Sequence, residues 1–147
     1  MKRRHITGFY IETLVLIVIF VTVVLVLTQI FGVSRNESRS ARMLTNAVTL
    51  AENAAEAVSA SRDPEALAQL LNTDNNAQYD EEEGVLAYYG PDLKPAADGV
   101  YLVQAGWEPQ QTDAGTLVNS RISVWYGQEK EPLYVLETAV YLPEVIS

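Results

Sequence analysis

The fold of this chain is decided by residues 9–31, which read FYIETLVLIVIFVTVVLVLTQIF. From Leu14 to Leu27 every side chain is apolar except that of Thr22. A bilayer core of roughly 30 Å needs about 20 mostly apolar residues in a helix that rises about 1.5 Å per residue. The form must be helical because lipid offers no partners for open backbone groups. The stretch therefore predicts a transmembrane helix over residues 9–31.

Glu12 is the one charged residue within this apolar stretch. A lone carboxylate is costly to bury in hydrocarbon. One interpretation places Glu12 at the level of the lipid headgroups, where the cost is small. The other is that an opposite charge meets the carboxylate, either within the protein or on a neighbouring subunit.

The residues before the span form a short basic leader, which contains Lys2, Arg3 and Arg4 and ends at Gly8. A basic leader, a glycine, an aromatic residue, a glutamate and a long apolar helix together resemble the N-terminus of type IV prepilins and pseudopilins. The run FYIET at residues 9–13 resembles the pilin-like proteins encoded with tight-adherence-type pilus systems in Gram-positive bacteria. The resemblance covers residues 2–31.

The resemblance implies a processing site and an assembly residue. In that family a membrane peptidase cuts after the glycine, which corresponds to Gly8, so that Phe9 becomes the new N-terminus. The family's glutamate, which corresponds to Glu12, neutralises the N-terminal amine of the adjacent subunit during assembly. That glutamate is usually the fifth residue of the mature chain, whereas Glu12 is the fourth after Gly8. A cut after Thr7 would restore the usual spacing but would not follow a glycine.

Length and composition limit the size and the chemistry of the domain that follows the span. Of its 147 residues, about 110 follow the span, enough for one small domain with a modest core. There is no cysteine, which excludes disulfides and thiol chemistry. The single histidine, His5, lies in the leader, so the domain has neither a histidine-dependent catalytic triad nor a histidine-rich metal site.

Charge divides the chain into a basic start and an acidic remainder. The formal net charge is −9, and all of the 19 acidic residues except Glu12 and Glu37 follow Arg42. An acidic domain argues against nucleic acid and anionic membrane surfaces as its partners. The basic leader favours a cytoplasmic N-terminus, although Arg35, Arg39 and Arg42 beyond the span nearly balance it. A cleavable secretory signal is the competing interpretation, but its apolar region is normally about 7 to 15 residues long.

Helical periodicity continues beyond the span. Six apolar residues recur at spacings of three and four and predict one buried stripe: Ala41, Leu44, Val48, Ala51, Ala55 and Val58. Ser34 and Glu37 have capping-box spacing, so a new helix could begin there. We favour one helix that continues through Gly32 and ends near Arg62. The stripe either covers a sheet or forms a seam with a neighbouring subunit.

Asp63 and Pro64 mark the next element. A proline disfavours helical geometry at the residue before it, so the first helix ends there. Asp63 then caps a short second helix with Pro64 at its first position, over residues 64–71. Further on, Asp80–Glu83 is the densest charge run. It lacks the alternating carboxylates and turn glycine of a calcium loop, which favours a solvated loop over a calcium site.

The C-terminal half changes from helical to alternating periodicity. It predicts strands at 85–89, 99–107, 117–126 and 133–142. The turns between them are marked by Gly90-Pro91, residues 111–115 and residues 127–132. Eight aromatic residues gather here and are expected in the core or in cross-strand pairs, with a binding surface as the alternative: Tyr88, Tyr89, Tyr101, Trp107, Trp125, Tyr126, Tyr134 and Tyr141.

These observations predict an α+β chain. A long N-terminal transmembrane helix continues into an ectodomain helix that packs on an antiparallel sheet of about four strands. The expected divisions are a leader at 1–8, a span at 9–31, an extended helix at 32–62, and a short helix with a sheet at 63–147.

The expected function is a non-enzymatic pilin-like subunit at the cell membrane or in a surface filament, with an extracytoplasmic domain. Gly8 and Phe9 form the processing site, and Glu12 acts in assembly. The partners are other pilin-like subunits, a prepilin peptidase and membrane lipid. No phosphate loop, zinc spacing or nucleophile motif is present, so no catalytic residue, metal or cofactor is expected. The alternative is a permanent single-pass protein whose acidic domain binds a partner or ligand.

Overall fold

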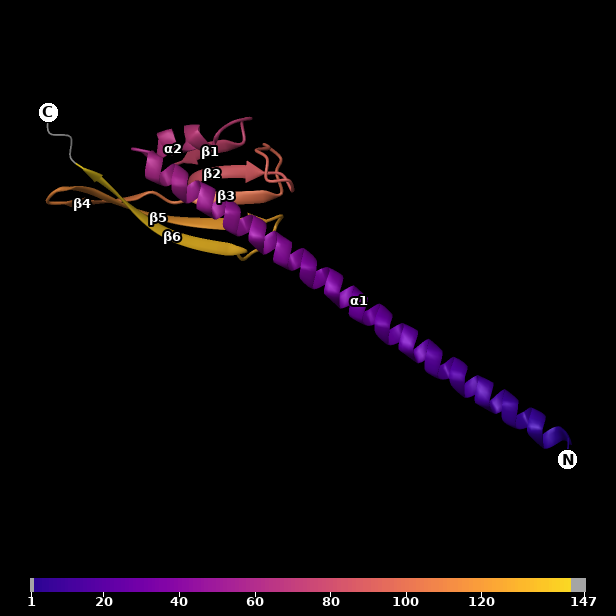
Figure 1. Cartoon of the computed structure of the whole chain (residues 1–147). Coiled ribbons are helices and arrows are strands. Elements are labelled where there is room, and N and C mark those ends of the chain that lie inside the picture. Colours follow the sequence, from indigo (N-terminus) through magenta and orange to yellow (C-terminus); the bar gives the residue numbers. More distant parts are fainter. Residues whose placement is uncertain (1, 144–147) are drawn as a thin grey trace. The chain divides into compact units, whose positions relative to one another are not determined.

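The computed structural model describes residues 2–143, and side chains from Gly8 onward. It divides into two compact units, Met1–Ala41 and Arg42–Ser147. The first is part of the long helix α1, Lys2–Ala60 (Figure 1). Helical geometry continues through Gly32, so no second helix begins at Ser34. The second unit contains the end of α1, the short helix α2 and the sheet.

Helix α2, Pro64–Leu71, confirms the prediction made from Asp63 and Pro64. The Oδ1 atom of Asp63 accepts a hydrogen bond from the backbone N–H of Ala66 at 2.7 Å, and Pro64 occupies the first turn. Leu67, Ala68 and Leu71 form the buried face of the helix. The cap satisfies one of the backbone donors that a helix start leaves without an internal partner.

Removing this cap should weaken the domain. Asp63→Ala should lower the free energy of unfolding by about 1 kcal/mol, because the Ala66 N–H loses its acceptor. Asp63→Asn, which keeps a side-chain oxygen at the same place, should lose much less. Trp107 and Trp125 both lie in the second unit, so tryptophan fluorescence during urea unfolding of the full chain in detergent reports this domain. Equal stability of the alanine variant and the parent would contradict the capping role.

The sheet has six strands, all paired antiparallel, rather than the four that we expected. Their bounds are β1 Ala77–Asp80, β2 Gly84–Tyr89, β3 Tyr101–Ala105, β4 Glu108–Thr112, β5 Gly115–Tyr126 and β6 Tyr134–Pro143. β2, β3, β5 and β6 correspond to the four predicted strands. The additional strands β1 and β4 are short and mostly exposed, and for this reason they carry no clear alternating pattern.

The strand order explains how the sheet is organised around β5. β3 pairs with residues 122–126 of β5, and β4 pairs with residues 115–119. β6 pairs with residues 115–124 of β5, and therefore runs along its opposite edge. β3 and β4 thus follow one another along the same edge of β5. The sheet is an up-and-down meander whose third strand is interrupted near Gly106.

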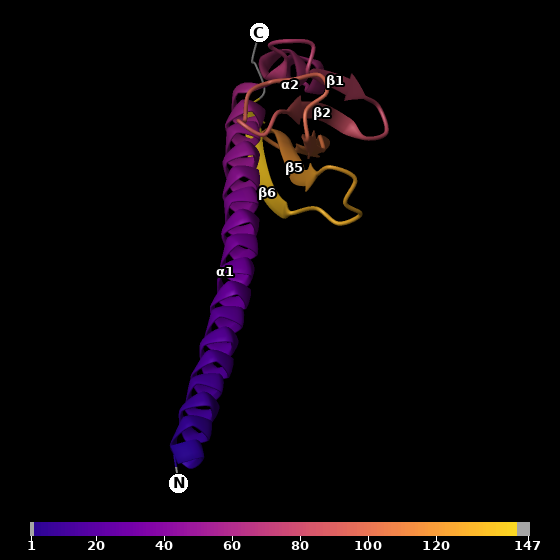
Figure 2. The same cartoon turned by 90° about the vertical axis from the view of Figure 1, so that its right-hand side faces the viewer.

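The core lies between one face of this sheet and the two helices. Figures 1 and 2 show the magenta end of α1 lying on the sheet, with α2 beside β1 and β2. In β3 the buried residues alternate, and they are Tyr101, Val103 and Ala105. The Tyr101 ring packs edge-on against Tyr126 at 5.0 Å between ring centroids, and its hydroxyl oxygen accepts a hydrogen bond from Asn46 Nδ2 at 3.1 Å.

The buried face of α1 differs from the predicted stripe. It consists of Ala47, Leu50, Ala51, Ala54 and Val58. Of the predicted stripe only Ala51 and Val58 are buried, while Ala41 is exposed and Leu44 keeps 46% of its surface exposed. The observed face is rotated by roughly 70° from the predicted one, at about 100° per residue. Alanines lie on both sides of the helix in this region, so the sequence pattern does not determine which side is buried.

Two glycines are required where backbones approach closely. A Cβ on Gly99 would lie 2.4 Å from the backbone carbonyl group of Tyr89. Gly84, at the start of β2, has a φ of +83°, and a Cβ there would lie 2.5 Å from the Ala105 carbonyl oxygen. Both positions therefore exclude side chains on steric grounds, and Gly84 also on conformational grounds.

Candidate functional site

The candidate site is the apolar part of α1. This helix includes one stretch, near the N-terminus, that is long and apolar enough to cross a membrane. None of the side chains in this stretch is buried against the rest of the protein. Phe9 and Phe31, at its two ends, keep 68% and 66% of their surface exposed. So large an exposed apolar surface marks a contact with lipid or with another protein.

Three threonines in this region satisfy their hydroxyl groups within the helix. Thr13 donates to the carbonyl oxygen of Phe9 at 2.9 Å, and Thr22 donates to that of Val18 at 2.8 Å. Thr28 donates in the same way to the carbonyl oxygen of Val24 at 2.8 Å. Each bond reaches back four residues, a geometry that hides the hydroxyl from an apolar surrounding. The three threonine hydroxyl groups therefore add little to the free-energy cost of placing the helix in lipid.

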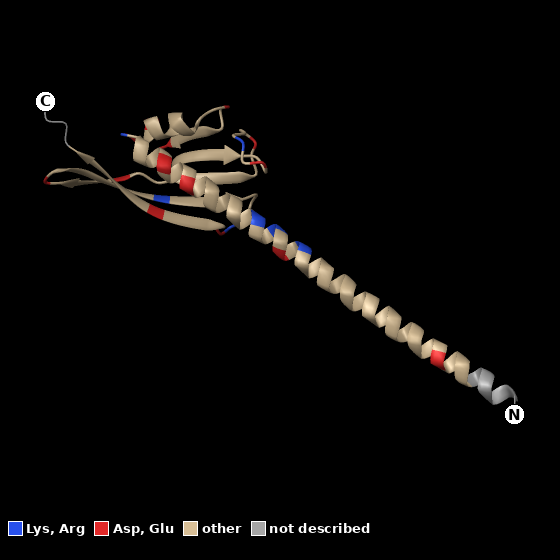
Figure 3. Cartoon of the chain, in the orientation of Figure 1, with Lys and Arg blue, Asp and Glu red and all other residues tan. Residues whose placement is uncertain are grey.

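Glu12 lies near the N-terminal end of this segment, and its side chain is exposed. It is the one charged residue from Gly8 to Ser34, seen as the isolated red band on the tan part of α1 in Figure 3. Within residues 8–143, no cationic side chain lies within ion-pair distance of its carboxylate. A partner for this charge must therefore come from outside the described part of the chain.

Gly8 and Phe9 stand in the same helical turn as Glu12. Among the side chains that the structure describes, none lies within 4 Å of the position that a Cβ on Gly8 would take. The ring of Phe9 packs edge-on against that of Tyr10, with 6.3 Å between centroids. The three predicted site residues thus lie together on the surface of one exposed helix end, and the Gly8–Phe9 bond is accessible from solvent or lipid.

The acidic run forms the turn between β1 and β2. The Asp80 carboxylate accepts hydrogen bonds from the backbone N–H groups of Glu82 and Glu83, at 2.8 and 3.0 Å. The bond from Glu83 and then that from Glu82 lower the pKa of the Asp80 carboxyl group, because both stabilise its charged form. Within the described residues, no three acidic side chains converge closely enough to hold a metal ion.

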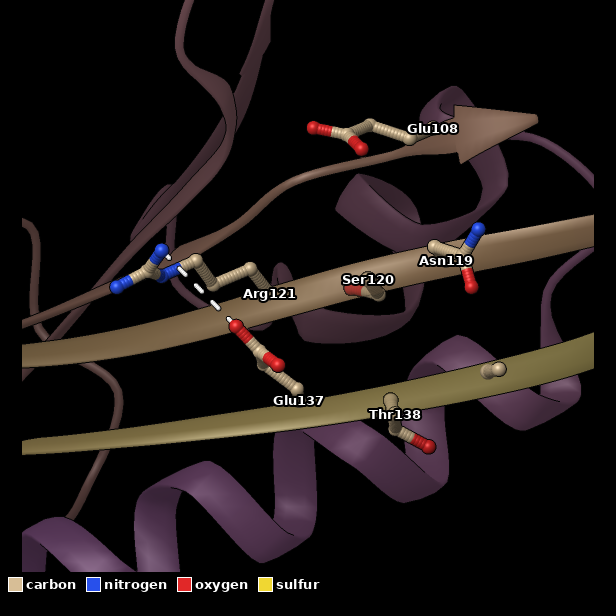
Figure 4. Close-up of a pocket in the computed structure, with 7 residues that line it drawn as sticks. Glu108, Asn119, Ser120, Arg121, Glu137 and Thr138 are labelled. Carbon is tan, nitrogen blue, oxygen red and sulfur yellow. Dashed lines mark ion pairs between the residues drawn. The ribbon is translucent and has the colours of Figure 1, made fainter. Parts of the chain in front are cut away.

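A polar groove lies on β5 and β6, beside Glu108 of β4 (Figure 4). Arg121 and Glu137 face each other across the two strands, with 3.9 Å between Nη1 and Oε1. The Ser120 hydroxyl donates to the Gly106 carbonyl oxygen at 2.7 Å, which braces the point where the β3–β4 edge is interrupted. Apart from Ala139, the residues that line the groove are polar or charged.

The roles predicted for Gly8, Phe9 and Glu12 stay predictions, and one feature of the helix around them was not predicted. The hydrogen bonds from the hydroxyl groups of Thr13, Thr22 and Thr28 to carbonyl oxygens four residues earlier were not predicted, although a threonine in an apolar helix commonly makes this bond. Comparison with family models, with curated proteins and with solved structures gave no match for this chain.

Proposed function

We propose that this chain is a non-enzymatic, pilin- or pseudopilin-like subunit of a bacterial pilus or secretion filament. It is anchored in the cell membrane by α1 and assembles with other subunits through that helix. The observation that carries the proposal is Glu12, a single carboxylate without an ionic partner in the described residues, on a helical segment that is otherwise uncharged and exposed from Gly8 to Ser34. The resemblance of the leader supplies the missing partner, which is the N-terminal amine of the next subunit.

The energetics favour an arrangement of many copies. A carboxylate in hydrocarbon is unfavourable, and an ammonium group beside it removes much of that cost by direct attraction in a medium of low dielectric constant. The amine exists only after the leader has been removed. Processing therefore creates the amine that attracts the Glu12 carboxylate of a neighbouring subunit, so the processed helix is stabilised in the membrane by a second copy.

Gly8 suits the processing step. A peptidase acts on an extended backbone, so α1 must unwind locally around the Gly8–Phe9 bond. Glycine lowers the cost of this unwinding by about 1 kcal/mol relative to alanine, because it is a poor helix former. Gly8 is also exposed and has no described side chain packed against it, so unwinding here breaks no described side-chain contact.

The proposed topology places the leader in the cytoplasm and the α+β domain outside it. Lys2, Arg3 and Arg4 provide the compact positive charge that favours retention of the N-terminus. The acidic second unit is then the part exposed on the membrane surface or on the filament.

The processing test separates this proposal from a permanent membrane anchor. Co-expression with a prepilin peptidase should shorten the chain by the leader, as intact mass and N-terminal sequencing will show. The new N-terminus should be Phe9, or Gly8 if the cut follows Thr7. Gly8→Leu should block the first cut without disturbing the distant domain. A chain that keeps its leader beside an active peptidase would instead favour a single-pass protein whose acidic domain binds a partner.

A further inference from the structure

Three arginines follow the apolar segment on one side of α1. Arg35, Arg39 and Arg42 are spaced by four and three residues in continuous helix. At about 100° per residue they fall within roughly 60° of one another around the helix. All three are exposed, and within residues 8–143 none of them makes an ion pair. We call this set the arginine stripe; Figure 3 shows it as the blue bands on α1.

The charge of the stripe is not neutralised by its own helix. Glu37 is the one acidic residue between Arg35 and Arg42. It lies two positions from Arg35 and from Arg39, which places it on the opposite side of the helix. The positive charge is therefore confined to one face, in a chain whose net charge is −9.

The stripe lies where α1 leaves the apolar segment. Arg35 is four residues beyond Phe31, about 6 Å along the axis at about 1.5 Å per residue. Side chains on a helix lean toward its N-terminus, so those of the stripe lean back toward Phe31. With Phe31 near the edge of the hydrocarbon, the guanidinium group of Arg35 reaches the depth of the lipid phosphates. Arg39 and Arg42 stand about 12 and 17 Å beyond Phe31 along the axis, so their positive charges lie over the headgroups.

We propose that the arginine stripe binds the phosphate groups of anionic phospholipids at the membrane surface where α1 emerges. This inference rests on the membrane anchoring in the proposed function, but not on filament assembly. A guanidinium group presents paired N–H donors that match two phosphate oxygens, and it is always charged. The acidic domain repels the same lipids, so the attraction is local to the stripe.

A local reporter can measure this lipid preference in the full chain. The two native tryptophans lie in the second unit, so a tryptophan introduced by Phe31→Trp reports the lipid beside the stripe after subtraction of the parent signal. The chain is reconstituted in phosphatidylcholine with either brominated phosphatidylcholine or brominated phosphatidylglycerol as quencher. The ratio of the two quenching efficiencies gives the relative affinity for the anionic lipid at this position.

We expect phosphatidylglycerol to be preferred at Phe31→Trp by about fivefold or more, since each arginine near the surface contributes roughly a factor of five. Raising the salt concentration should reduce the preference. The triple substitution Arg35→Gln, Arg39→Gln and Arg42→Gln should bring the ratio close to one. In a matched chain with Phe9→Trp, which reports the leader end, the same triple substitution should leave the ratio unchanged.

Other outcomes overturn the inference. Equal quenching by the two lipids, or a preference that survives the triple substitution, would show that the stripe does not bind anionic lipid. If the triple substitution instead weakens self-association in neutral lipid, the stripe faces the acidic domain of a second copy. If neither introduced tryptophan is quenched by either lipid, the helix is not inserted, and the proposed membrane anchoring fails together with this inference.

Discussion

Glu12→Ala should leave membrane insertion intact and abolish incorporation into a filament. The carboxylate is the one charge in the apolar, exposed segment from Gly8 to Ser34, so its removal makes insertion easier or leaves it unchanged. In the proposed filament the same substitution should prevent assembly, because the amine of the neighbouring subunit would then remain in the membrane without a counter-charge. Removing one member of a buried ion pair typically costs about 3–5 kcal/mol, which exceeds the net worth of the intact pair.

The measurement compares two fractions from the same cells. Membrane fractionation gives the inserted chain, and sheared filaments or crosslinks to the major subunit give the assembled chain. Glu12→Gln should fail as the alanine variant does, since it keeps the shape and hydrogen-bonding groups but removes the charge. Glu37→Ala is the matched control, because Glu37 is an exposed glutamate on the same helix beyond the apolar segment.

Normal assembly of the Glu12→Ala subunit would show that Glu12 is an interfacial residue, and the pilin-like proposal would lose its main support. Loss of membrane insertion in the same variant would also contradict the argument, because it would mean that the charge assists insertion rather than opposes it.

The elements that the sequence predicted are those with local signals. Helix α2 follows from Asp63 and Pro64, whose effects on helix geometry act within a few residues. β3 has alternating buried residues, and β6 alternates between half-buried and exposed positions, so both carry a period-two pattern in the sequence. β2 and β5 contain several buried apolar residues, which made them recognisable as strands. The acidic turn at Asp80 was likewise expected as a solvated loop, and its side chains lie at the surface.

The elements that the sequence missed depend on distant partners. β4, Glu108–Thr112, is exposed at every position and contains a proline, and it is a strand because it pairs with β5. β1 is likewise a strand because it pairs with β2. The phase of the buried face of α1 was missed for a related reason, since the sheet selects among similar alanine-rich faces. No ion pair of Glu12 is present within residues 8–143, so the fold of the single chain does not test the partner expected for this carboxylate.

The burial of Asn76 was not predicted from the sequence. It stands at the end of the run Thr73–Asn76, whose residue types are typical of a turn, yet it keeps just 1% of its surface exposed. Its Oδ1 atom accepts from the backbone N–H of Thr73 at 2.9 Å, and its Nδ2 atom donates to the Tyr88 carbonyl oxygen at 3.1 Å. The side chain thus ties the turn after α2 to the end of β2.

Asn76→Ala should therefore lower the free energy of unfolding of the domain by about 2–4 kcal/mol, because a buried polar group left without a partner carries its full desolvation cost and a cavity adds to it. The Thr73 N–H loses its acceptor, while the Tyr88 carbonyl oxygen still accepts from the Ala96 N–H at 3.2 Å. Urea unfolding of the full chain in detergent, followed by the fluorescence of Trp107 and Trp125, measures the change. Asn53→Ala, at an exposed position on α1, should leave the midpoint almost unaltered, since alanine is also the better helix former. A loss below about 0.5 kcal/mol for Asn76→Ala would mean that water replaces the amide in the turn, and that α2 and the sheet are held together by their apolar contacts alone.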